Sequence, residues 1–314
     1  MAIELSYVLI TPYTILKSRT GGVIARLLSR TDLELVGAQM MTPTRELAEK
    51  YAAILKKSVS SKAADLLSDY VLNSFTPNED GSKRRVLMLL FKGDNACSKL
   101  YSIAGRLAPE SRGAGEMRIT GETVRDTYAD LVFDRNGNLK YFEPAVLLPP
   151  DQDFAMEKLK LFASFAENHP NVVDVSYEDK ADVERTLVII KPDNWRYPSS
   201  KPGNIIDMFS RTGLRIIGTK IYQMSVAEAL EFYGPVQTVL REKLAPKIGE
   251  KAKEILEAEF KLKLPENSAS KLSDIVGVPF ADDQFSQIVE FMSGTRPENC
   301  PKNKLNDPGL VKTM

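Results

Sequence analysis

An internal repeat constrains the fold of this chain more than any other feature of its sequence. The stretch 10–37 matches the stretch 190–218, and over the core of the match the offset is constant at 181 residues, as between Gly22 and Gly203. A Ser-Arg-Thr triplet occurs identically in both stretches. Self-similarity at one offset is the signature of a repeated structural unit. We therefore predict two domains of one fold in this 314-residue chain.

The order of elements predicts the fold of each copy. Both copies begin with a short apolar run that ends before a proline, Tyr7–Ile10 and Thr186–Ile190, as expected of a buried strand. An amphipathic helix follows, then a second strand and a second helix, the latter with Thr44 or Ser225 as N-cap. The second strands and helices are predicted at 33–40, 44–51, 214–221 and 225–233. This order opens a ferredoxin-like βαββαβ sandwich, an α/β (α+β) fold.

The first copy is predicted to be complete and the second incomplete. In the first, a strand, a helix, a hairpin around Asn136-Gly137 and a closing helix follow, at 85–91, 95–105, 131–142 and 154–165. In the second, a polar helical insertion at about 235–283 precedes a helix at 285–292, and no third or fourth strand follows. The predicted domains are 1–168 and 183–314.

Composition excludes several classes of function. Lys plus Arg equals Asp plus Glu at 42 each, which argues against electrostatic capture of nucleic acid or an anionic membrane. His169 is the only histidine, and the cysteines are Cys97 and Cys300, interpreted as ordinary thiols, so no metal site is predicted. Few cysteines, no apolar stretch of spanning length and no signal-like amino terminus lead us to expect a cytoplasmic protein.

The second copy resembles the nucleoside diphosphate kinase family. The resemblance rests on Ile-Lys-Pro-Asp at 190–193, followed by Gly203, a Gly-Leu-Arg-Ile-Ile-Gly run from Gly213, and Tyr233. The first copy resembles the family more weakly, from Thr11-Pro12 onward. The family resemblance implies transfer of a γ-phosphate between nucleotides through a phosphohistidine, with Mg²⁺ on the phosphates. It also implies nucleoside di- or triphosphates as partners and favours a homo-oligomer.

The resemblance also implies roles for individual residues. Lys191 falls on the family's phosphate-site lysine and Tyr233 on its active-site tyrosine. The base-stacking phenylalanine aligns with Phe285, within one position of register. In the first copy, Tyr51 matches the tyrosine and Arg125 a phosphate-contacting arginine.

The decisive departure lies at the nucleophile. Leu148 occupies the position of the family's histidine, and Pro149-Pro150 follow it. Leucine has no nucleophilic atom, and proline restricts the backbone. Thr11 replaces the phosphate-site lysine of the first copy. His169 lies past the closing helix, where we interpret it as an exposed linker residue.

Three functions follow as hypotheses. The first is a nucleotide-binding relative of the kinases that lacks phosphohistidine chemistry within this sequence, with binding confined to the second copy. The second is a fragment of an active nucleoside diphosphate kinase, because 308–314 resembles the approach to a third strand. The third is a non-catalytic interaction module that uses the insertion and an unfinished sheet edge.

Overall fold

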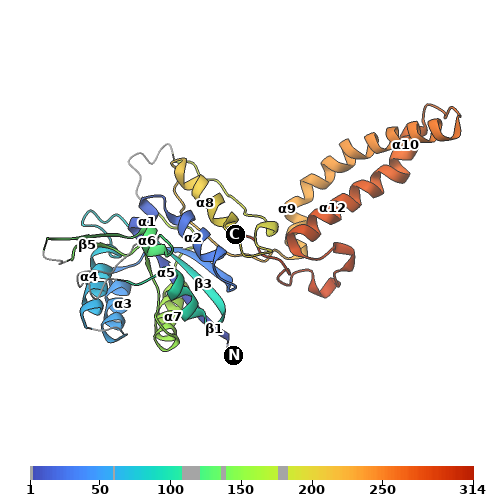
Figure 1. Cartoon of the computed structure of the whole chain (residues 1–314). Coiled ribbons are helices and arrows are strands. Elements are labelled where there is room, and N and C mark those ends of the chain that lie inside the picture. Colours follow the sequence, from blue (N-terminus) through green and yellow to red (C-terminus); the bar gives the residue numbers. More distant parts are fainter. Residues whose placement is uncertain (1–2, 59–60, 108–120, 136–138, 176–182) are drawn as a thin grey trace. The chain divides into compact units, whose positions relative to one another are not determined.

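The computed structural model describes residues 3–58, 61–107, 121–135, 139–175 and 183–314, and it combines helices with a β-sheet (Figure 1). The strands are β1 (Ile3–Ile10), β2 (Glu34–Met41), β3 (Val86–Asp94), β4 (Asp130–Phe133), β5 (Leu139–Glu143) and β6 (Val146–Leu147). The helices before the second copy are α1 (Pro12–Leu16), α2 (Thr20–Ser29), α3 (Arg45–Ser58), α4 (Ser61–Ser74), α5 (Ala96–Ala104), α6 (Val124–Tyr128) and α7 (Gln152–Ala166). The later helices are α8 (Lys201–Arg211), α9 (Val226–Val239), α10 (Ala245–Phe260), α11 (Ser268–Leu272) and α12 (Val278–Ser293). Short 3₁₀ or π segments are η1 (Pro192–Asn194), η2 (Leu240–Leu244), η3 (Ser273–Gly277), η4 (Pro297–Asn299) and η5 (Lys302–Lys304).

The first copy has the predicted ferredoxin-like topology. Its sheet has the order β2-β3-β1-β6, and every pair of neighbours is antiparallel. The central pair, β1 and β3, is in register from Ile3 opposite Asp94 to Ile10 opposite Leu87. β4 and β5 form a separate hairpin. Its predicted Asn136-Gly137 turn lies outside the described residues.

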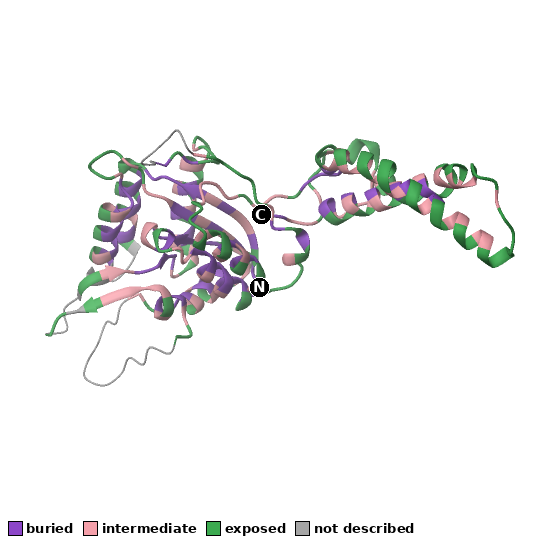
Figure 2. Ribbon diagram, turned by 90° about the horizontal axis from the view of Figure 1, so that it is seen from above, coloured by how far each residue is buried: buried purple, intermediate pink, exposed green. Residues whose placement is uncertain are grey.

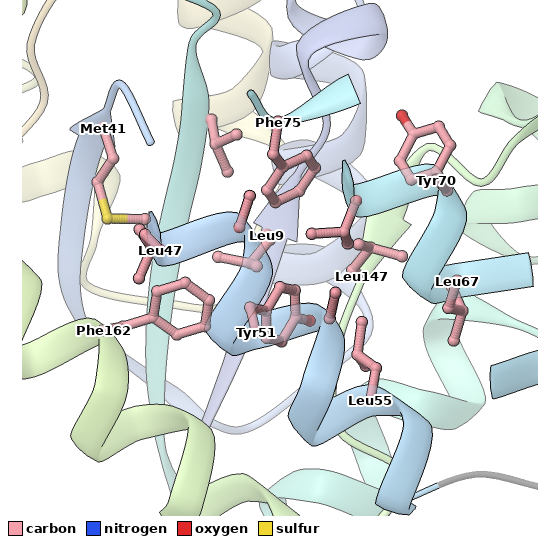
Figure 3. Packing of buried hydrophobic residues seen from close by; sticks show 14 of the residues in the cluster. Leu9, Met41, Leu47, Tyr51, Leu55, Leu67, Tyr70, Phe75, Leu147 and Phe162 are labelled. Atoms are coloured by element: carbon pink, nitrogen blue, oxygen red, sulfur yellow. The ribbon is translucent and has the colours of Figure 1, made fainter. Parts of the chain in front are cut away.

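Helices cover both faces of this sheet, which explains the unbroken apolar run of β1. Tyr7, Val8, Leu9 and Ile10 are all completely buried. Because side chains alternate along a strand, such a run requires apolar neighbours on both sides. Tyr7 and Leu9 join a cluster with side chains of α3, α4 and α7, including Tyr51 and several labelled residues of Figure 3.

The described chain divides into two compact units. Unit 1 comprises 1–190 and 194–221, and unit 2 comprises 191–193 and 222–314. The division does not follow the sequence repeat, because α8 of the second copy packs within unit 1 against α2, its counterpart in the first copy. Gly21 and Gly203 lie at this helix crossing, where their backbones approach closely.

Unit 2 consists mainly of two helical segments that lie side by side (Figure 1). One runs through α9, η2 and α10, and the other through α11, η3 and α12. Their buried residues lie mainly in α9 and α12, and much of the remaining surface is intermediate or exposed (Figure 2). The insertion predicted at about 235–283 is mainly helical in the structure. Its α10 packs against α11 and η3, which lead into α12.

Two strands predicted for the second copy are wrong. The segment 186–190 has no regular structure, and Leu187 is 76% exposed. The segment 214–221 forms only an isolated bridge between Gly218 and Val172. A strand is stable only when a neighbour satisfies its backbone groups, and the described residues of the second copy supply no sheet for these segments to join. The second copy is thus an incomplete version of the fold.

No helix among the described residues is both long enough and apolar enough to cross a membrane.

Candidate functional site

A cavity in unit 2 brings together two of the residues predicted to bind nucleotide. Lys191 and Tyr233 both line this cavity, which has a volume of about 370 Å³. We call it the Lys191–Tyr233 cavity. Its other lining residues are Val236, Leu240, Leu244, Gln284, Gln287, Ile288, Phe291 and Met292. Its floor is therefore largely apolar, with one cation and two amide side chains, a combination suited to an organic ligand that carries negative charge.

Lys191 owes its place to the proline that follows it. Pro192 is buried and begins the 3₁₀ turn η1, whereas Lys191 itself is exposed. Proline fixes its own backbone and disfavours the helical region for the residue before it. The Lys-Pro pair thereby holds the lysine at the start of the turn, where the long side chain reaches the cavity.

Tyr233 lies on α9, whose start is fixed by a capping box. The Ser225 hydroxyl accepts a hydrogen bond from the backbone N–H of Glu228 at 3.2 Å, and the Glu228 carboxylate accepts one from the backbone N–H of Ser225 at 2.9 Å. Burial raises the pKa of Tyr233. Its hydroxyl therefore stays protonated at neutral pH and is a hydrogen-bond donor.

The α12 wall of the cavity corrects the assignment of Phe285. Gln284, Gln287, Ile288 and Phe291 recur at helical spacing and share the face that lines the cavity. Phe285 lies on the neighbouring face and is only 4% exposed, so it packs in the core of unit 2 and cannot stack on a ligand in this structure.

Sequence analysis missed the aromatic residue that does line the cavity, Phe291. This residue is 42% exposed. Phe291 could have been found from the helical period, because it lies seven positions after Gln284, on the same side of a helix.

Tyr51 of the first copy is a core residue. It is 1% exposed and accepts a hydrogen bond from the Tyr7 hydroxyl at 3.4 Å. Its ring packs edge-on against Phe162, with ring centroids 5.1 Å apart (Figure 3). Burial raises the pKa of Tyr51 above its ordinary value. Phe162 of α7 fills the space beside the ring in this structure, and the role of Tyr51 as a nucleotide contact stays a prediction from the resemblance.

Arg125 is likewise buried in the first copy. It is 5% exposed and donates hydrogen bonds to the backbone carbonyls of Gly105 and Val146, the latter at 2.9 Å. Burial lowers the pKa of Arg125 to about 10, which still leaves it protonated at neutral pH. The guanidinium joins β6 to the end of α5 instead of facing a phosphate. Its role as a phosphate contact stays a prediction from the resemblance, because the described contacts of the guanidinium are to backbone carbonyls.

The remaining first-copy positions are closed as well. Thr11 is completely buried, and its backbone N–H donates to the carbonyl of Ala145 at 3.1 Å. Leu148, which the resemblance aligns with the family's nucleophile, is 9% exposed and follows β6 directly. At these two positions the first copy therefore presents packed side chains and a backbone hydrogen bond.

His169 is not the exposed linker residue that the sequence suggested. Its Nε2 accepts a hydrogen bond from the backbone N–H of Thr42 at 3.1 Å, and its Nδ1 lies 2.9 Å from the carbonyl oxygen of Pro170. The ring also packs against Phe165. Burial lowers the pKa of His169. The Nε2 contact thus joins the segment after α7 to the residue that follows β2, and the Nδ1 contact is local to the next residue of the chain.

The described residues do not form a metal centre. No group of three or more histidine, cysteine, aspartate or glutamate side chains among them has an arrangement that could hold a metal ion. The Lys191–Tyr233 cavity, whose lining is fully described, has no carboxylate in its wall. Mg²⁺ prefers oxygen ligands and is commonly held through phosphate oxygens. These residues thus do not fit a metal site held by protein side chains.

Comparison with known proteins places the sequence similarity in the second copy. Residues 184–241 match the family model described as nucleoside diphosphate kinase. A nucleoside diphosphate kinase of Cereibacter sphaeroides is 46% identical over 52 residues, which is 17% of this chain and 36% of that protein. The corresponding protein of Polynucleobacter necessarius is 44% identical over the same length, with the same coverage. The chain thus spans about a third of the curated relatives it matches.

Solved structures add a weaker likeness. A nucleoside-diphosphate kinase from Borrelia burgdorferi, solved with vanadate and ADP, is 14% identical and covers 57% of this chain and 96% of its own, with a TM-score of 0.39. The matched family segment contains Lys191 and Tyr233, and the chain is nucleoside diphosphate kinase-like there.

Proposed function

We propose that this protein binds a nucleoside di- or triphosphate in the Lys191–Tyr233 cavity and that the residues of this sequence do not perform phosphohistidine transfer. The observation that carries the proposal is the convergence of Lys191 and Tyr233 on one cavity, because both residues belong to the segment 184–241 that is similar to the kinases.

The lining of the cavity offers polar groups suited to the phosphates of a nucleotide and an apolar ring suited to its base. The Lys191 ammonium is suited to a phosphate, because a charge-assisted hydrogen bond is stronger than a neutral one. The exposed Phe291 ring offers a flat apolar surface for a base, and aromatic stacking on a base tolerates every base. Tyr233, Gln284 and Gln287 supply hydrogen-bonding groups beside them. Selectivity among bases should accordingly be low.

The absence of phosphohistidine chemistry is proposed from two positions. Leu148 lacks a nucleophilic atom, and the ring nitrogens of His169 are both occupied by backbone partners. A nucleophile requires a free lone pair that can reach the phosphorus atom. Mg²⁺ would arrive on the nucleotide's phosphates, as the family resemblance implies, because the cavity wall offers it no carboxylate.

Calorimetric titration of the full chain with ADP and ATP, each with Mg²⁺, tests the binding site. Loss of a hydrogen bond to a charged group costs about 1.5–3 kcal/mol, so Lys191→Ala should weaken binding by roughly ten- to hundredfold. Lys247→Ala is the matched control, because Lys247 is an exposed lysine of α10 outside the cavity. Equal affinity in the wild type and Lys191→Ala would refute the placement.

Incubation with γ-labelled ATP and Mg²⁺ tests the chemistry separately. We expect no acid-labile, base-stable label on the protein. Such a label would favour the alternative, a fragment of an active nucleoside diphosphate kinase. If the labelled phosphoryl group were attached to His169, the only histidine of the sequence, the variant His169→Gln would carry no label.

A further inference from the structure

A second cavity lies within unit 1, between α2 and α8, and its lining is rich in positive charge. Its volume is about 570 Å³. Its cationic lining residues are Lys17, Arg19, Arg26, Arg30 and Arg211. All of its lining residues belong to the described part of the chain, and Asp207 is the one carboxylate among them. We call it the α2–α8 cavity.

Arg26 of α2 and Arg30, the residue that follows α2, donate hydrogen bonds to neutral oxygen atoms, so their charge is not cancelled. The Arg26 Nη1 donates to the backbone carbonyls of Gly121 and Thr123, each at 2.7 Å. Arg30 donates to the backbone carbonyl of Glu122. These hydrogen bonds hold both side chains in place at the cavity, and neither guanidinium forms an ion pair with any described carboxylate.

Two other cations of the cavity are paired, which leaves an excess of positive charge. Arg211 pairs with Asp207 at 2.7 Å, and Arg19 with Asp130 at 3.0 Å. The Lys17 ammonium lies over the neutral ring of Tyr13, 5.6 Å from its centroid. Arg26 and Arg30 therefore contribute two charges that no described carboxylate pairs with, and Lys17 adds a third, although it shares the charge of Asp130 with Arg19.

We propose that the α2–α8 cavity binds a small polyphosphate anion, a chain of two or three phosphoryl groups. Held guanidinium groups match phosphate oxygens through paired N–H donors. The wall adds the hydroxyl groups of Ser18, Ser29 and Ser200 and the amide of Asn204, which can donate to the same oxygens. The chain of phosphates can be free or part of a nucleotide, because the cavity recognises the same oxygen atoms in both.

This site is separate from the Lys191–Tyr233 cavity and goes beyond nucleotide binding there. The two cavities share no lining residue, and they belong to different compact units. The net charge of the sequence does not indicate this cationic site, because 42 cationic and 42 anionic residues sum to zero. Clustering of the cations at one place is a property of the fold.

The experiment is calorimetric titration of the full chain with sodium tripolyphosphate at low ionic strength. The double variant Lys17→Gln/Arg30→Gln should bind at least about tenfold more weakly, because it removes two of the three cations that supply the excess positive charge. Raising the salt concentration should weaken binding by the wild type, since these contacts are solvent-accessible. Asn204→Asp is a second variant, which adds a repulsive charge to the wall and should also weaken binding.

The controls separate this site from general attraction and from the other cavity. Lys92→Gln/Arg106→Gln removes two exposed cations of unit 1 outside the cavity and should leave the affinity unchanged. Lys191→Ala should also leave tripolyphosphate binding unchanged. Equal weakening by the control pair, loss in Lys191→Ala, or no saturable binding would overturn the proposal. A parallel titration of Lys191→Ala with ATP distinguishes a free phosphate chain from a nucleotide. If ATP and tripolyphosphate bind this variant with equal affinity, the cavity recognises the phosphates alone. If ATP binds more tightly than tripolyphosphate, the cavity recognises a nucleotide.

Discussion

Gly21 and Gly203 meet at the crossing of α2 and α8, and neither position has room for a side chain. A Cβ atom on Gly21 would overlap the backbone carbonyl of Gly203 and the backbone N–H of Asp207. A Cβ on Gly203 would overlap the carbonyl of Gly21 and the backbone N–H of Ala25. The two copies of the repeat therefore contact each other through α2 and α8, the helices that lie within the repeated stretches.

Alanine at either glycine should destabilise unit 1. Both collisions are with backbone, which cannot move aside as a flexible side chain can, so Gly21→Ala or Gly203→Ala should cost about 1–3 kcal/mol. Denaturant titration followed by fluorescence measures this, because Trp195 is the only tryptophan and lies in unit 1. Gly234→Ala is the control: it lies within α9 with open space around it and should be neutral or slightly stabilising. An unchanged midpoint for Gly21→Ala would contradict the packing of α2 on α8.

Arg125→Met should destabilise the first copy. The substitution keeps a long side chain and leaves the carbonyl groups of Gly105 and Val146 buried without their donor. We expect a loss of about 2–4 kcal/mol in the free energy of unfolding, from two unsatisfied acceptors. Circular dichroism during urea unfolding provides the measurement. The exposed Arg135 supplies the matched variant, Arg135→Met, and a similar small effect in both would show that the buried hydrogen bonds contribute little.

His169 should make stability depend on pH on the acidic side of neutrality. Burial lowers its pKa in the folded protein below the ordinary value of 6.5, so the unfolded chain binds the proton more readily. Stability contributed by the neutral ring is complete above pH 6.5 and is lost as the pH falls toward the folded pKa. His169→Gln should flatten that part of the profile.

Nuclear magnetic resonance gives the pKa of His169 directly. The sequence has one histidine, so its ring protons yield one assignable titration curve. A midpoint at or above 6.5 would show that the ring is solvated in the folded protein and that the hydrogen bond from Thr42 is absent.

The two cysteines should differ in reactivity. Cys97 is 2% exposed, and burial raises the pKa of its thiol, whereas Cys300 is more exposed. Thiolate is the reactive form, so a disulfide reagent such as Ellman's should label Cys300 in the native protein and Cys97 only on unfolding. Cys300→Ser isolates the signal of Cys97. Rapid native labelling of that variant would mean that α5 opens readily.

Local patterns in the sequence predicted the central strands and two helix caps, but they missed α1, α4 and α6 of the first copy. The apolar run at Tyr7–Ile10 and the run from Arg85 correspond to β1 and β3. Thr44 caps α3, with its hydroxyl accepting from the backbone N–H of Leu47 at 3.2 Å, and Ser225 caps α9 as predicted. Strand periodicity and cap chemistry act over a few residues, so they can be read without the tertiary structure.

The same patterns failed where the outcome depended on distant partners. Thr186–Ile190 has the composition of a strand, but no described strand pairs with it. Phe285 and Phe291 are equally aromatic and lie on one helix, and only packing decides which is buried and which faces the cavity.

The sequence by itself determined the repeat, the ferredoxin-like order of the first copy and the likeness to nucleoside diphosphate kinases in the second. These follow from residue identity and local periodicity. Tertiary structure decided that Arg125 and Tyr51 are buried, that Lys191 meets Tyr233 and that cations gather between α2 and α8. Burial and charge density arise from residues far apart in the chain, and folding alone brings them together.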